Sequence, residues 1–453
     1  MGRLKTAVGT VLEDLRQRDV ERAREPDVCK TERNIRINVY HGIVSIISVN
    51  LAAPFIGIFA VKLGASNFEV GLLSSGPALV SLLSMIPGGK FIDRRPDQKR
   101  ILGRLIFLQR LFYLFIATIP FFTSDSRAPL LVAAVALMNM PASIANVGWQ
   151  AFISRIVPPA RRAEAFASRN RLMNLVGTLV VLLTGRIIDV VGFPLGYQIV
   201  FAAAFVVALV EIWVFNHIDD STAKSYGPAD ILTPDKAPKG VLASIVDDIR
   251  QIFRQGPFKR YLLASAVFYF AWQTPWPLFT LYQVKVLGAN NLWVSLLNLA
   301  NTGGSLVGYG FWVRMMNKHG NLKTLFMSSI WIFIVPLVYG FSHSLTTVAV
   351  FNLLTGAIFS GVNLALFNAL LEVTPEETKA TYIAYYTTAV NGSAILAPMA
   401  GVALLDTLGF FWAFMVCAAL RIAGSLTFLV VNYLERRTSS RPSATTGTAV
   451  PAS

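Results

Sequence analysis

A run of about twenty apolar residues recurs along nearly the whole chain and limits what the chain can fold into. A helix needs roughly 20 apolar residues to cross the ~30 Å hydrocarbon core of a bilayer. Only helices and closed barrels satisfy all their backbone hydrogen bonds in the hydrocarbon core. Uninterrupted apolar runs do not fit the strands of a barrel, in which apolar and polar residues alternate. The mean hydropathy of +0.55 agrees. We therefore predict an all-α polytopic membrane protein, with transmembrane helices at residues 37–61, 68–89, 101–122, 129–153, 170–188, 195–217, 259–282, 291–313, 322–341, 345–369, 380–404 and 410–434.

The basic residues divide unevenly between the two sides of these twelve spans. With the N-terminus inside, 34 of the 40 lysines and arginines fall in the arm, loops and tail of one side. The other side holds only Lys62, Arg127, Arg186 and Lys285. Short cytoplasmic loops carry such an excess. The net charge of +15 thus indicates topology rather than nucleic-acid binding, and we expect a multi-pass plasma-membrane protein with both termini cytoplasmic.

An internal repeat divides the chain into two halves. "GASNFEVGLL" at 64–73 returns as "GANNLWVSLL" at 288–297, and "DVVGF" at 189–193 returns as "DTLGF" at 406–410. Both repeats precede matching spans, which predicts two parallel six-helix bundles. The expected organisation is a cytoplasmic arm with a short amphipathic helix (1–36), a first bundle (37–217), a linker with an amphipathic helix (218–258), a second bundle (259–435) and a disordered tail (436–453).

A charged loop follows the second span and reads "GGKFIDRRPDQKR" at 88–100. It matches a family pattern, Gly-x-x-x-Asp-Arg-x-Gly-Arg-(Arg/Lys), except that Pro96 replaces the second glycine and the basic pair arrives two residues late. On this motif and the parallel repeat, residues 37–435 resemble the major facilitator superfamily. The resemblance implies two pseudo-symmetric bundles, and a gate formed by this loop. The matching residues are Gly89, Asp93, Arg94, Arg95, Lys99 and Arg100.

The acid of this loop is the best candidate for a gating contact. A carboxylate at a helix end is stabilised near the N-terminus of another helix. We expect Asp93 to contact the other half near the start of the span at residue 380, in one transport state only. The alternative is that the basic residues of the loop only anchor the topology.

Candidate substrate ligands follow from the resemblance, which implies that spans one, four, seven and ten line a central cavity. Polar residues within spans are costly unless they face protein or water. Amide and aromatic groups prevail, without a carboxylate near the centre of these spans, which favours a neutral or amphiphilic organic molecule. Alternatively, the amides hold helices together. The candidates are His41, Ser45, Ser48, Asn139, Asn146, Gln150, Tyr269, Trp272, Gln273, Trp276, Asn352, Thr355, Phe359 and Asn363.

Ionisable residues within the spans bear on a coupling ion. Arg110, Glu211 and Arg421 lie in spans three, six and twelve, which the resemblance places on the outside of each bundle. Glu211 is about two turns from the cytoplasmic end, and we expect it to reach the interface. His41 is the one titratable group on an expected cavity face and is a candidate for binding a coupling proton. Coupling to protons, to sodium or to neither stays open here.

The resulting hypothesis is an alternating-access secondary transporter, with export favoured by the aromatic lining. A sugar-type uptake permease is the alternative transporter, and a non-transporting membrane sensor is the alternative of another class. No enzyme is expected, because the spans contain no paired acids, HExxH or Ser/His pair, and no phosphate-binding loop of the G-x-x-x-x-G-K type appears. We expect no cofactor and no metal. The expected partners are a small-molecule substrate and the bilayer, and the chain is expected to be a monomer.

Overall fold

The fold was analysed in a computed structural model, which describes residues 26–93, 97–157, 159–220, 256–374 and 379–439. The described part is helical and contains no strand, so the all-α prediction is confirmed. The predicted amphipathic helices of the arm and linker, and most of the predicted tail, lie outside the described residues. The chain divides into two compact units, one from Met1–Asp235 with Ala289–Ser295 (unit 1) and one from Lys236–Gly288 with Leu296–Ser453 (unit 2).

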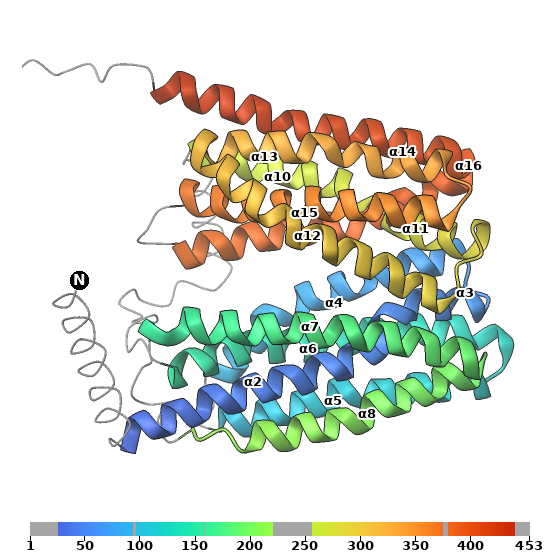
Figure 1. Ribbon diagram of the computed structural model, residues 1–453, viewed down its shortest axis with the longest axis vertical. Coiled ribbons are helices and arrows are strands. Elements are labelled where there is room, and N and C mark those ends of the chain that lie inside the picture. Colours follow the sequence, from blue (N-terminus) through green and yellow to red (C-terminus); the bar gives the residue numbers. More distant parts are fainter. Residues whose placement is uncertain (1–25, 94–96, 158, 221–255, 375–378, 440–453) are drawn as a thin grey trace, which may run out of the picture. The chain divides into compact units, whose positions relative to one another are not determined.

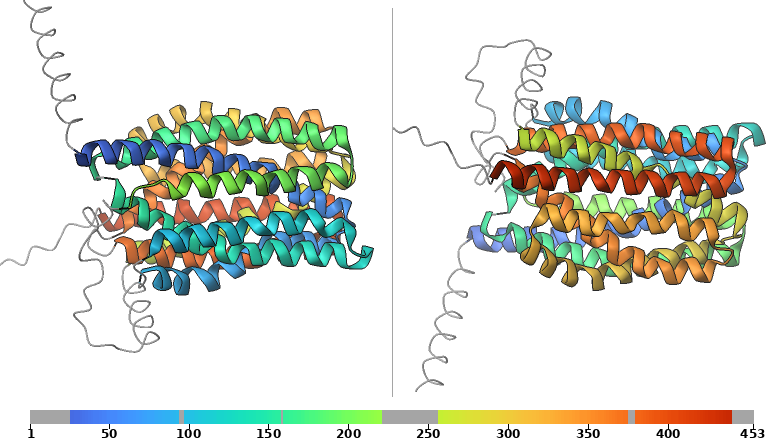
Figure 2. Two further views of the ribbon diagram at one scale, coloured as in Figure 1. Left: turned by 90° about the horizontal axis from the view of Figure 1, so that it is seen from below. Right: turned by 90° about the horizontal axis from the view of Figure 1, so that it is seen from above.

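Unit 1 is a bundle of six long helical stretches, each of which coincides with a predicted span (Figure 1). Helix α2 packs against α7 and α8, α5 packs against α6 and α8, and α4 packs against α6. The left view of Figure 2 shows α2 (dark blue) beside α8 (light green). The elements are α2 (Pro26–Ala52), η1 (Ala53–Phe55), α3 (Ile56–Lys62), α4 (Asn67–Asp93), α5 (Gln98–Thr118), η2 (Ile119–Phe121), α6 (Ser124–Ile156), α7 (Pro159–Val191) and α8 (Leu195–Asn216).

Unit 2 repeats this organisation with more interruptions. Helix α10 packs along α16, and α13 packs against both α15 and α16; the right view of Figure 2 shows α16 (red) beside α10 (yellow-green). The elements are α10 (Gly256–Gln273), α11 (Trp276–Leu281), η3 (Tyr282–Val286), α12 (Asn291–His319), α13 (Asn321–Ser329), η4 (Ile330–Phe333), α14 (Ile334–Phe341), α15 (Leu345–Val373) and α16 (Lys379–Ser439).

Two interruptions in unit 2 follow from single residues. The helix of span seven stops at Gln273 and restarts at Trp276. Pro275 lacks an amide hydrogen and cannot continue the α10 hydrogen bonds, which explains the break. Helix α16 contains both final spans, and its direction changes at Gly409, whose φ of 73° suits a residue without a side chain.

Close packing within unit 2 depends on glycine at the contact between α12 and α15. A Cβ on Gly304 would collide with the carbonyl oxygen of Leu353, and a Cβ on Gly356 would collide with that of Asn301. Small residues allow this backbone approach in helical membrane proteins. The contact is reinforced by Trp312, whose Nε1 donates to the carbonyl of Ala357 over 2.7 Å.

The length and composition of the described helices fit a membrane protein. Among the described residues, nine stretches are long and apolar enough to cross a bilayer, and one of them, Tyr385–Glu435, contains residues on both sides of Gly409 in α16. The helices of spans seven and eight fall outside this set, although both occupy the predicted ranges. The polytopic membrane prediction therefore stands on these helices, and their surfaces carry exposed aliphatic side chains such as Leu183 and Val307.

Candidate functional site

An aromatic cluster at the end of α10 is the core of the candidate site. The ring of Trp272 lies 5.6 Å from that of Tyr269 and 5.5 Å from that of Phe359 on α15, measured between ring centroids. The ring of Trp276 lies 6.4 Å from Trp272, across the helix break. The structure thus brings together the four predicted aromatic residues of unit 2, which are Tyr269, Trp272, Trp276 and Phe359. Such a cluster offers ring faces to an organic ligand.

Two polar atoms at the end of α10 are buried without a partner among the described residues. They are Nε1 of Trp272 and Oε1 of Gln273, and each side chain belongs to a residue that is only 6% exposed. Buried polar groups are normally hydrogen-bonded, and an unpaired one costs about 1–3 kcal/mol. The Trp272 donor in the aromatic cluster and the Gln273 acceptor on the next residue are therefore suited to a ligand that supplies the missing partners.

The predicted residues of α15 differ in their surroundings. Thr355 is buried, and its hydroxyl donates to the carbonyl of Phe351 on its own helix over 3.0 Å. Asn352 is half-buried and within hydrogen-bonding reach of the Tyr339 hydroxyl, whereas Asn363 is exposed. Of the predicted residues on α15, Phe359 is therefore the one whose contact with the ring of Trp272 is described.

The predicted amide face of α6 in unit 1 contains one paired contact. Gln150 Nε2 donates to Asn146 Oδ1 over 3.2 Å, and both side chains are exposed. Asn139 instead donates to the carbonyl of Val135 on its own helix over 2.8 Å. Asn146 and Gln150 therefore present a joint amide surface, while the amide nitrogen of Asn139 is already satisfied.

The three predicted residues of α2 point into the bundle of unit 1. Ser48 donates to the carbonyl of Ala204 on α8 over 2.8 Å, and Ser45 accepts a hydrogen bond from Arg110 over 3.2 Å. His41 is buried against the ring of Phe215, with 5.4 Å between the centroids. These residues share one helix face, as their spacing predicts, and that face contacts α5 and α8.

A buried ion pair lies beside these residues. Nε and Nη2 of Arg110 donate to the carboxylate of Glu211 over 3.0 and 3.2 Å, and Nη1 donates to the Tyr113 hydroxyl. The expectation that Glu211 reaches the interface is wrong, because this residue is 1% exposed and held by Arg110. Paired burial costs less than burial of either charge alone, so the two side chains turn inward together. His41 Nε2 lies 3.8 Å from the same carboxylate.

Unit 2 buries an arginine in a different way. Arg421 on α16 is 1% exposed and donates to the carbonyl oxygens of Ile332 and Trp272 over 3.1 and 2.7 Å. Its guanidinium lies 5.5 Å from the ring centroid of Phe279. No ion pair to Arg421 occurs within the part of the chain that the structure describes. This arginine is thus hydrogen-bonded to the backbone of Trp272, a residue of the aromatic cluster.

The charged loop between α4 and α5 is partly described. Lys99 donates to the carbonyl of Ile218, two residues beyond α8, over 2.6 Å, and its Nζ lies 3.8 Å from the carboxylate of Asp220. Arg100 pairs with Asp97 at 3.4 Å on the exposed start of α5. Gly89 and Asp93 belong to the last turns of α4, whereas Arg94 and Arg95 lie outside the described residues. The gating role of this loop stays a prediction.

A pair of tyrosines in unit 2 was missed by the sequence analysis. The rings of Tyr261 on α10 and Tyr386 on α16 stack, with 5.8 Å between centroids and 14° between planes. Both side chains are buried, and Tyr261 donates to the carbonyl of Leu366 over 2.7 Å. The tyrosines of "TYIAYY" at 381–386 were the available signal, but their helix was not among those expected to line a cavity.

Comparison with protein families shows what this architecture is. The family model of the Major Facilitator Superfamily matches residues 42–307 and 261–453. The chain therefore belongs to the major facilitator superfamily, whose members include secondary transporters. No protein in the curated set matches the sequence significantly.

Solved structures agree on the fold. A mutant of the nucleoside transporter NupG superposes with a TM-score of 0.67 at 10% identity, covering 87% of this chain and 99% of that one. A bacterial homologue of the human lysosomal transporter Spinster, in an inward-facing unoccupied conformation, gives 0.60 at 15% identity, with 91% and 98% covered. A POT family transporter in complex with 5-aminolevulinic acid gives 0.63 at 14% identity, with 88% and 96% covered. At such identities the likeness concerns the fold.

Proposed function

We propose that this major facilitator protein exports a small, neutral or amphiphilic organic molecule by alternating access. The observation that carries the proposal is that Trp272 Nε1 and Gln273 Oε1 are buried without a partner in the described residues, while the ring of Trp272 contacts those of Tyr269 and Phe359. Apolar pockets with a few fixed polar groups are the usual form of small-molecule sites. The strongly asymmetric distribution of lysine and arginine supports a plasma-membrane orientation with both termini inside.

The charge of the two helices supports a neutral or amphiphilic substrate. Helix α10 contains no aspartate or glutamate, and the one acid of α15, Glu372, lies in its last turn. A strongly cationic ligand would lack a counter-charge on these helices. The aromatic rings favour an amphiphile, because they can cover the apolar part of the ligand while the indole N–H and the amide form hydrogen bonds with its polar part.

A ligand screen by thermal stability tests the proposal. The purified full-length protein in detergent is heated with sugars, amino acids, nucleosides, organic acids and amphiphilic drugs, because ligands that bind the folded state raise the melting temperature. We expect amphiphiles to raise it, and Trp272→Phe and Gln273→Leu to reduce the effect. Trp331→Phe, at an exposed tryptophan of the same unit, is the matched control and should respond like the wild type.

A sugar-type uptake permease is the second candidate, and the exposed amide pair of Asn146 and Gln150 favours it. Planar amides offer both donors and acceptors to sugar hydroxyls. A melting shift with sugars that disappears in Asn146→Ala would move the assignment to this candidate. Ligand binding without any flux in proteoliposomes would instead indicate a sensor.

We propose His41 as the group that takes up a coupling proton. Both ring nitrogens of His41 are buried without a hydrogen-bond partner in the described residues, and Nε2 faces the Glu211 carboxylate at 3.8 Å. The charges that act on His41 are Glu211 from α8, Arg110 from α5 and Arg169 from α7. A proton on the imidazole would change the balance of charge in this cluster of Glu211, Arg110 and Arg169.

The coupling proposal is tested by His41→Gln in proteoliposomes. We expect this variant to lose pH-dependent net transport and to retain substrate exchange, which needs no proton movement. Ser48→Ala, about two turns further along the same face of α2, is the control for disturbance of the helix and should keep the pH profile. A pH profile of His41→Gln equal to that of the wild type would remove His41 from the mechanism.

A further inference from the structure

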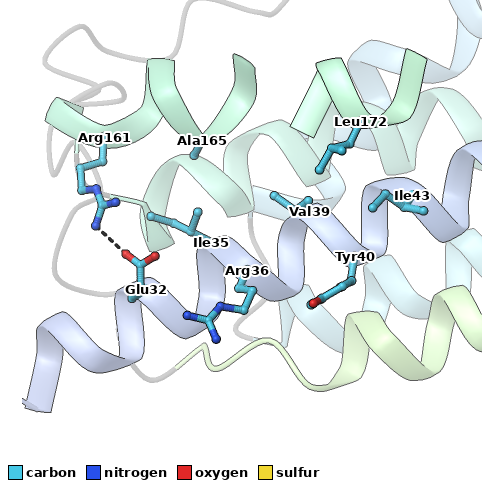
Figure 3. Close-up of a pocket in the computed structure, with 9 residues that line it drawn as sticks. All are labelled: Glu32, Ile35, Arg36, Val39, Tyr40, Ile43, Arg161, Ala165 and Leu172. Carbon is cyan, nitrogen blue, oxygen red and sulfur yellow. Dashed lines mark hydrogen bonds and ion pairs between the residues drawn. The ribbon is translucent and has the colours of Figure 1, made fainter. Parts of the chain in front are cut away.

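A pocket between the N-terminal parts of α2 and α7 in unit 1 belongs to none of the sites described above. Figure 3 shows its lining, with Ile35, Val39 and Ile43 on α2 and Leu172 on α7. Its volume is about 320 Å³. The side chains here are apolar toward the middle of the helices and charged toward their N-terminal ends, so the pocket is amphipathic along the helix axes.

The charged end of the pocket carries a surplus of positive charge. Arg161 from α7 pairs with Glu32 on α2 at 2.7 Å, which leaves Arg36 as a lining cation with no ion pair in the described residues (Figure 3). Lys30 and Arg33 precede it at spacings of three, and all three side chains of this row are exposed. Residues three apart share a helix face, so α2 presents a basic row beside the pocket.

The apolar end continues along α7 as an exposed aliphatic row. Leu172 lines the pocket, and Leu175, Leu179 and Leu183 follow at helical spacing with exposed fractions of 62%, 54% and 65%. The apolar runs of the predicted spans begin at residues 37 and 170, so the basic row of α2 lies just before its span and the leucines of α7 lie within theirs. The boundary between polar headgroups and hydrocarbon therefore falls within the pocket.

We propose that this pocket binds an anionic phospholipid, with the headgroup phosphate at Arg36 and Arg161 and one acyl chain along Val39, Ile43 and the leucine row of α7. Basic pockets between membrane helices bind anionic lipid headgroups through charge, and the apolar continuation distinguishes a lipid from a soluble anion. Tyr40, 56% exposed beside Arg36, offers a phenol at headgroup level, where tyrosine is enriched in membrane proteins.

Lipid binding is measured by native mass spectrometry of the full-length protein titrated with dioleoylphosphatidylglycerol. Dioleoylphosphatidylcholine and the deacylated headgroup glycerophosphoglycerol are the comparison ligands. We expect phosphatidylglycerol to bind more tightly than either. Arg36→Gln should weaken its first binding step about fivefold, as expected for one basic side chain near an anionic surface. Arg104→Gln, at an exposed arginine of α5, is the matched control and should leave the affinity unchanged.

A second pair of variants separates lipid binding from loss of folding. Glu32→Gln removes the acid that pairs with Arg161, so it should strengthen phosphatidylglycerol binding, an effect that misfolding would not produce. Val39→Trp fills the pocket and should weaken phosphatidylglycerol binding. Equal affinity for phosphatidylcholine, equal affinity for the deacylated headgroup, or equal affinity of Arg36→Gln and Arg104→Gln would each overturn the proposal.

Discussion

Units 1 and 2 each bury an arginine inside a membrane bundle, and they compensate its charge in opposite ways. Arg110 of unit 1 meets the carboxylate of Glu211 in two hydrogen bonds, whereas Arg421 of unit 2 is held by two backbone carbonyls and faces an aromatic ring. A carboxylate cancels the charge, while carbonyl dipoles only solvate it. Unit 1 is thus neutral at this pair, and unit 2 retains a positive charge behind Trp272.

The contrast indicates different tasks for the two clusters. The pair in unit 1 is surrounded by His41 and Ser45, so a proton arriving there changes a network of charges. Arg421 instead fixes the backbone of Trp272 next to the break in span seven. Intramembrane ionisable residues usually mark functional sites because their burial is costly. We therefore interpret unit 1 as the proton-responsive half and unit 2 as the half with the ligand contacts.

The largest expected effect is that of Glu211→Gln, which leaves Arg110 buried without its counter-charge. Breaking a buried pair by removing one partner costs about 3–5 kcal/mol. The free energy of unfolding in mixed detergent micelles measures this loss. The double replacement Arg110→Met with Glu211→Leu should recover most of the stability, because it removes both charges. A loss of under 1 kcal/mol in Glu211→Gln would show that the pair is not what balances unit 1.

A smaller loss is expected for Arg421→Met. This change removes two hydrogen bonds from a charged donor but also the cost of burying an unpaired cation, so the net destabilisation should be about 1–2 kcal/mol. The same mixed-micelle unfolding measures it, and ligand binding should weaken because the backbone of Trp272 loses its tether. A loss as large as that of Glu211→Gln would contradict the distinction between the two units.

The smallest expected effect is that of Arg100→Gln at the exposed start of α5. Its pair with Asp97 joins side chains that are 71% and 65% exposed, and pairs of this kind contribute about 0.2–1 kcal/mol. Unfolding of this variant at low and high salt measures the contribution, which added salt should remove. A salt-independent loss of more than 2 kcal/mol would mean that Arg100 has a contact beyond this surface pair.

The sequence predicts most of the fold because the bilayer restricts the choices. The apolar runs predict the ranges of the spanning helices in the described residues, and Pro275 explains the break in span seven. The repeats around residues 64 and 288 predict two halves, and the chain divides into two compact units. Helical spacing also identifies which residues share a face, as for His41, Ser45 and Ser48 on α2.

The sequence does not determine the direction in which each face points. The face of α2 that carries His41, Ser45 and Ser48 contacts α5 and α8. This contact depends on how the helix is rotated within its bundle, and the spacing of the residues does not determine that rotation. Glu211 turns inward because Arg110, a hundred residues away, offers a partner. Asn139 bonds to its own helix, which spacing alone does not distinguish from a free amide. The predicted aromatic residues of span seven lie together at the end of α10 because they are close in sequence, and their role in binding stays a prediction.

The most direct test is flux of the strongest screening ligand in proteoliposomes that contain the wild type, Gln273→Leu or Trp331→Phe. We expect the wild type and Trp331→Phe to transport the ligand, and Gln273→Leu to transport it at least about tenfold more slowly, as loss of one buried hydrogen bond to the ligand implies. Equal flux in all three proteins would contradict the assignment of the ligand contacts to the end of α10.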